Sequence, residues 1–66
     1  MVHVRFEGES YDFAERQVDV TDASPDREIR RAVAAKLEVA PERLGSYVVD
    51  RSESGDVVVR PEAVYG

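Results

Sequence analysis

The chain has 66 residues, of which 42% are apolar and 35% are charged, and it contains no cysteine. This length predicts a single domain over residues 1–66, and the cysteine-free composition excludes disulfides, thiolate metal sites and cysteine nucleophiles. A net charge of −5 disfavours nucleic-acid binding, and no apolar run could cross a membrane, so we expect a cytoplasmic acidic protein without membrane contact.

The segment VHVRF near the start of the chain alternates apolar and polar residues, as a half-buried strand does. Its apolar face holds Val2, Val4 and Phe6, and its polar face holds His3 and Arg5. The sequence therefore predicts a first strand with one face toward the core.

A second strand is predicted after a turn in the segment EGES. Its apolar residues begin with Tyr11 and Phe13, and the next apolar pair is Val18 and Val20. Because the spacing from Phe13 to Val18 is odd, the apolar face switches sides. We expect a bulge or kink at residues 14–17 to absorb that change.

One amphipathic helix is predicted in the middle of the chain. Ser24 is the expected N-cap and Pro25 the first helical residue, while Pro41 ends the helix at or before Ala40. The apolar stripe at helical spacing consists of Ile29, Ala32, Val33, Leu37 and Ala40. Leu44 is expected to anchor the loop that follows the helix to the core.

Three arginines give this helix its most distinctive charges. Arg27 and Arg31 are four residues apart on one face, a spacing that is destabilising for like charges unless acidic groups offset them. One interpretation is internal pairing, with Asp26 reaching Arg30 and Glu28 reaching Arg31. The alternative is a small basic patch that docks an acidic partner.

The last third of the chain predicts a β-hairpin that turns at Ser-Glu-Ser-Gly. Its apolar residues fall in two phases, and only one phase can face the core. The smaller phase holds Val48 and Val58, and the larger holds Tyr47, Val49, Val57 and Val59. We expect the larger set to fill the core and the smaller set to point outward.

The order strand, strand, helix, strand, strand predicts an α+β fold with the helix packed on one face of a four-stranded mixed sheet. A right-handed crossover between the two hairpins would place the first and fourth strands side by side and parallel at the centre of the sheet.

This order resembles that of the ubiquitin-like family, whose fold is the ββαββ β-grasp. The segment LEVAPERL is similar to the stretch after the helix in that family, where a small apolar residue, a proline, polar residues and a leucine lead into the third strand. Val39, Pro41 and Leu44 hold the apolar, proline and leucine places here. The resemblance implies a β-grasp fold that presents the helix-free face of its sheet to partner proteins.

The leading hypothesis is a non-enzymatic ubiquitin-like protein that binds protein partners through this sheet face. The candidate interaction residues are Val48, Val58, Arg5, Arg51 and Arg60. The alternative is a covalent protein modifier or sulfur carrier, activated at Gly66 by an adenylating enzyme. Family members that act in this way end in Gly-Gly, whereas this chain ends in Val64, Tyr65 and Gly66.

The sequence contains no pattern typical of a catalytic or metal site. His3 is the only histidine and is expected at the surface, and the hairpin turn lacks the glutamate that a calcium loop needs, because Pro61 stands there. The carboxylates near the first turn, Glu7, Glu9, Asp12 and Glu15, are interpreted as a solvated acidic edge. We therefore predict neither an enzyme nor a cofactor.

Overall fold

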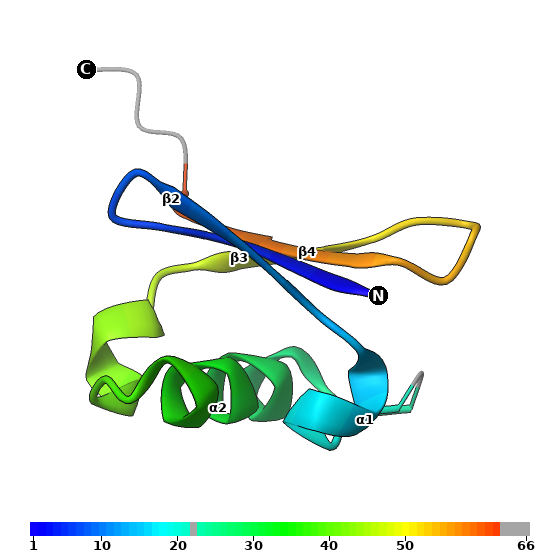
Figure 1. The fold of residues 1–66 in the computed structure, drawn as a ribbon, viewed down its shortest axis with the longest axis horizontal. Coiled ribbons are helices and arrows are strands. Elements are labelled where there is room, and N and C mark those ends of the chain that lie inside the picture. Colours follow the sequence, from blue (N-terminus) through cyan, green and yellow to red (C-terminus); the bar gives the residue numbers. More distant parts are fainter. Residues whose placement is uncertain (22, 63–66) are drawn as a thin grey trace.

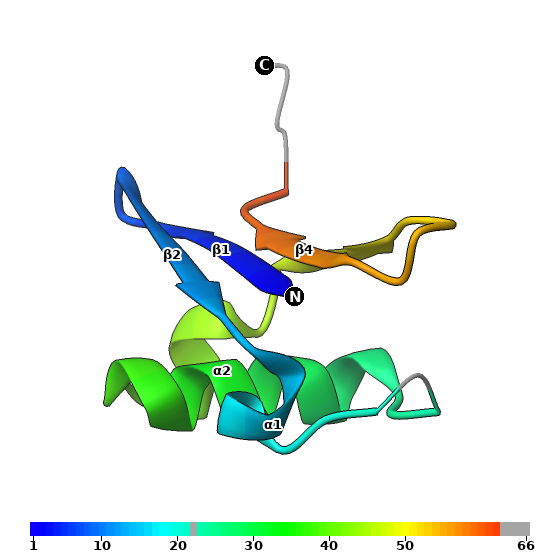
Figure 2. The same ribbon diagram turned by 45° about the vertical axis from the view of Figure 1, so that its right-hand side comes forward.

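The computed structural model describes residues 1–21 and 23–62. Its elements in chain order are β1 (Val2–Phe6), β2 (Glu9–Phe13), α1 (Glu15–Val18), α2 (Asp26–Leu37), the 3-10 helix η1 (Pro41–Leu44), β3 (Val48–Arg51) and β4 (Val57–Arg60). Both α1 and α2 lie on the same side of the sheet (Figures 1 and 2). None of the helices in the described ranges is long and apolar enough to cross a membrane.

The four strands form one mixed sheet in the order β2-β1-β4-β3. The central strands β1 and β4 are parallel, with Val4 paired to Val59, and each of them pairs antiparallel with its own hairpin partner. The predicted α+β class and the predicted parallel pairing of the first and fourth strands are therefore confirmed.

The core lies between the sheet and α2. Its buried side chains are Val2, Val4, Phe6, Val18, Val20, Ile29, Val33, Ala34, Leu44, Val57 and Val59. Tyr47 and Val49 are partly buried and pack against this cluster, whereas Val48 and Val58 lie outside it. The predicted phase of the second hairpin is thus confirmed, and so is the burial of Leu44, which is 0% exposed.

Both hairpin turns form where the sequence predicts them. Glu7 and Gly8 have φ angles of 51° and 81°, which suits a two-residue turn whose twist matches that of the flanking strands. In the second turn the amide of Ser52 donates to the carbonyl of Asp56 at 2.9 Å, and Gly55 has a φ of 93°. A glycine accepts these left-handed angles without steric cost.

The prediction of a bulge or kink in a longer second strand was wrong. β2 ends at Phe13 and a single helical turn, α1, follows. Gln17 accepts a hydrogen bond from the amide of Ala14 at 2.7 Å through its side-chain oxygen, which caps that turn. The turn carries the chain from the sheet to the helix layer, where Val18 and Val20 become buried.

The predicted start of the main helix was one residue early. α2 begins at Asp26, and Pro25 occupies the N-cap position instead of the first helical position. The hydroxyl of Ser24 accepts from the amide of Thr21 at 2.9 Å and so belongs to the preceding loop. The helix ends at Leu37, as the prediction of an end before Pro41 requires.

Candidate protein-interaction face

The side of the sheet opposite the helices, which we call the open face, is defined by strand alternation and register. Its members are His3, Arg5, Ser10, Asp12, Val48, Asp50, Val58 and Arg60. Four of the five interaction residues predicted from the sequence lie on it: Arg5, Val48, Val58 and Arg60. The fold therefore brings together residues from both hairpins that are more than forty positions apart in the chain.

The strand register arranges the open face in two rows that cross the sheet. One row contains Asp12, His3, Val58 and Asp50. The other contains Ser10, Arg5, Arg60 and Val48, because Arg5 and Arg60 directly follow the paired residues Val4 and Val59. Adjacent strands are about 4.8 Å apart, so the two arginines emerge side by side from the central strands.

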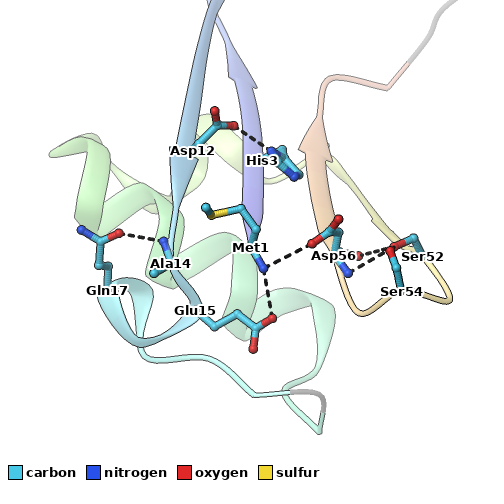
Figure 3. A network of polar contacts seen from close by, with 9 residues as sticks. All are labelled: Met1, His3, Asp12, Ala14, Glu15, Gln17, Ser52, Ser54 and Asp56. Carbon is cyan, nitrogen blue, oxygen red and sulfur yellow. Dashed lines mark hydrogen bonds and ion pairs between the residues drawn. The ribbon is translucent and has the colours of Figure 1, made fainter.

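A hydrogen bond and an ion pair bridge neighbouring strands on the open face. Nδ1 of His3 lies 2.7 Å from Oδ1 of Asp12 (Figure 3). Nε and Nη2 of Arg60 lie 2.8 and 2.7 Å from Oδ2 of Asp50. Val48 and Val58, which lie beside these pairs on the open face, are half-buried, so only part of each side chain is accessible.

Arg5 differs from the other charged residues of the open face. Its side chain is exposed, and its guanidinium forms no ion pair or hydrogen bond within the described ranges 1–21 and 23–62. It stands next to Arg60, whose charge Asp50 offsets. No described neighbour offsets the charge of Arg5, so its guanidinium is suited to an incoming anion.

The structure corrects the placement of the fifth predicted residue, Arg51. It pairs with Val57 and so belongs to the helix-covered side of the sheet. Its Nη2 lies 2.6 Å from the carbonyl oxygen of Ser24 and 2.8 Å from Oδ1 of Asp26. Arg51 therefore joins the end of β3 to the start of α2. The sequence could not predict this contact, because alternation along a strand does not show which strand residues lie near the start of the helix.

Internal pairing of the helix arginines, the first of the two interpretations above, is not observed. Asp26 is engaged by Arg51, and Arg30 donates to the carbonyl oxygen of Tyr47 at 3.5 Å. Arg27 and Arg31 are exposed and form no ion pair with another described residue. Both arginines lie on α2 and therefore on the opposite side of the sheet from the open face (Figures 1 and 2), so they can serve as controls in binding experiments.

A polar network that the sequence does not predict surrounds the N-terminal ammonium (Figure 3). The nitrogen of Met1 lies 3.2 Å from Oε1 of Glu15 and 3.4 Å from Oδ1 of Asp56. The hydrogen bond from the ammonium to Glu15 and the charges of both carboxylates raise the pKa of this amino group above its usual value of 8.0. The network joins β1 to the starts of α1 and β4, so its role is structural.

Within residues 1–21 and 23–62, no three histidine, aspartate or glutamate side chains are grouped so that they could hold a metal ion. Gly66, the predicted conjugation terminus, lies outside the described residues. Activation at Gly66 by an adenylating enzyme remains a prediction from the sequence.

No protein family model matches this sequence, and neither the curated proteins nor the solved structures contain a significant match.

Proposed function

We propose that the chain is a non-enzymatic β-grasp module, similar to ubiquitin-like domains, that binds a partner protein through its open face. The observation that carries this proposal is the one-sided cover of the sheet. Within residues 1–21 and 23–62 the helices cover one face only, and the other face presents Val48 and Val58 beside Arg5 and Arg60. The ββαββ order with a parallel central pair supports the assignment of a β-grasp.

The chemistry of the open face fits a small interface with a mixed character. Two partly accessible valines can lose water on contact, while the surrounding charged groups fix the orientation of a partner. Burying an accessible apolar side chain contributes roughly 25 cal/mol per Å² of area removed from water. Two half-buried valines are therefore insufficient by themselves, and polar contacts must supply part of the specificity.

Site-specific photocrosslinking in the native host tests the proposal. A photoreactive amino acid replaces Ser10, an exposed residue of the open face, and in a matched control replaces Ala35, an exposed residue on the outer side of α2. We expect a covalent adduct from position 10 and none from position 35. Adducts from position 35 alone, or from neither position, would contradict the proposal.

A double variant, V48T/V58T, completes the test. Threonine keeps the β-branched shape and the strand preference of valine while it replaces a methyl group with a hydroxyl. We expect this variant to fold and to lose the adduct at position 10. An adduct of undiminished yield would show that the valines do not contact the partner.

A further inference from the structure

We infer that the partner presents an acidic segment to the open face and that Arg5 binds its carboxylate. This inference rests on the proposed function, because it names the chemistry of the partner that the same face would bind. Two independent features support it: the unpaired guanidinium of Arg5 and the distribution of charge over the whole chain.

Arg5 is the one charged side chain of the open face without a partner in the described part of the chain. Arginine is the side chain best suited to a carboxylate, because its planar guanidinium can donate two parallel hydrogen bonds. A carboxylate placed over Arg5 would also lie beside Arg60, which emerges from the neighbouring central strand.

The open face is balanced in charge, whereas the chain as a whole is acidic. On the open face the charges of Arg5 and Arg60 cancel those of Asp12 and Asp50. The whole chain carries −5, so all of this net negative charge lies elsewhere. Away from the open face and from the exposed Arg27 and Arg31 of α2, an acidic segment meets a net repulsion, which slows association and disfavours wrong orientations.

The positions of Val48 and Val58 indicate that the partner segment also needs an aliphatic side chain. Val48 pairs with Arg60 across β3 and β4, in the same row as Arg5. Val58 lies in the neighbouring row, between His3 and Asp50. A segment that crosses the central strands would place a carboxylate at Arg5 and an aliphatic side chain against Val48 or Val58. The expected partner segment therefore combines an aspartate or glutamate with a nearby leucine, isoleucine or valine.

The test uses the full chain and a displayed library of random short peptides. We expect the enriched peptides to carry this acidic and aliphatic combination. The affinity of one synthetic peptide is then measured for the wild type and for R5E, V48T/V58T and R31E. Arg31 is a matched control, because it is also an exposed arginine without an ion-pair partner in the described ranges, but it lies on α2.

The inference predicts that R5E weakens binding by about tenfold or more, which corresponds to about 1.4 kcal/mol, while R31E changes it less than about twofold. Loss of binding in V48T/V58T but not in R5E would overturn the acidic partner and leave the open face as the binding surface. Loss only in R31E would overturn both the inference and the proposed function. Enriched peptides without acidic residues, or no enrichment, would overturn the inference.

Discussion

Arg60 and Asp50 form a diagonal ion pair across the β3–β4 hairpin, with two guanidinium nitrogens of Arg60 within 2.8 Å of one carboxylate oxygen of Asp50. This pair offsets one of the two adjacent cations on the open face, whereas Arg5 has no partner among residues 1–21 and 23–62. Asp50 therefore competes with the carboxylate of an acidic partner for the guanidinium of Arg60.

Replacing Asp50 should therefore strengthen the binding of an acidic peptide. In D50N the guanidinium of Arg60 becomes available, and we expect the affinity to rise several-fold. The free energy of unfolding should fall by no more than about 1 kcal/mol, because the pair is exposed. The matched control is D26N, which removes the same charge from the helix side. Equal gains in both variants would show a general charge effect and no competition at the open face.

Arg51 should contribute to stability and not to binding. R51Q removes its bonds to Ser24 and Asp26, and with them the link between β3 and α2. We expect a loss of about 1 kcal/mol in the free energy of unfolding, measured by urea denaturation, because the interactions are partly exposed. The affinity for the acidic peptide should stay within about twofold of the wild type. A large loss of affinity would place Arg51 in the interface after all.

Leu44 should be among the most sensitive core positions. It is 0% exposed and comes from η1, so L44A leaves a cavity under the loop after α2 and should cost about 2–5 kcal/mol. Domains have about 0.05–0.15 kcal/mol of stability per residue, which is about 3–10 kcal/mol for 66 residues, so this loss would remove a large share of the total stability. The control V48A should cost about 1 kcal/mol or less, because Val48 is half-buried on an edge strand. Similar losses in the two variants would contradict the assigned core.

The N-terminal network predicts a dependence of stability on alkaline pH. Folding raises the pKa of the Met1 amino group above 8.0, so the protonated form is favoured in the folded state. This contribution is fully present below the unfolded pKa and is lost as the pH rises through the folded pKa. We expect the urea midpoint of the free-amine chain to exceed that of an N-acetylated chain at neutral pH. The two midpoints should converge above the folded pKa, and a constant difference would exclude the ion pair as its cause.

The sequence predicts the sheet better than the connections. Alternation in the first strand identifies its buried face. In the second hairpin alternation leaves two phases, and the larger apolar set correctly selects the phase of Val59, which is buried. The odd spacing between Phe13 and Val18 marks a change of face, but a bulge and a helical turn both satisfy it. The helical turn prevails because Gln17 caps it and because it brings Val18 into the helix layer.

Part of the candidate site could also be predicted from strand alternation. Arg5, Val48, Val58 and Arg60 follow from alternation and from the parallel pairing of β1 and β4. The pairing of Asp50 with Arg60, which singles out Arg5, depends on side-chain geometry that no periodicity contains. The sequence likewise could not predict the ion pair of Arg51 with Asp26 at the start of α2.

Binding through the open face is tested most directly by mapping backbone amide chemical shifts. The isotope-labelled chain is titrated with the purified partner that is trapped from position 10. We predict that the largest shifts fall on the open-face residues of β1, β3 and β4, including Arg5, Val58 and Arg60, and that V48T/V58T abolishes them. Shifts confined to α2 around Arg27 and Arg31, with the sheet unchanged, would contradict binding through the open face.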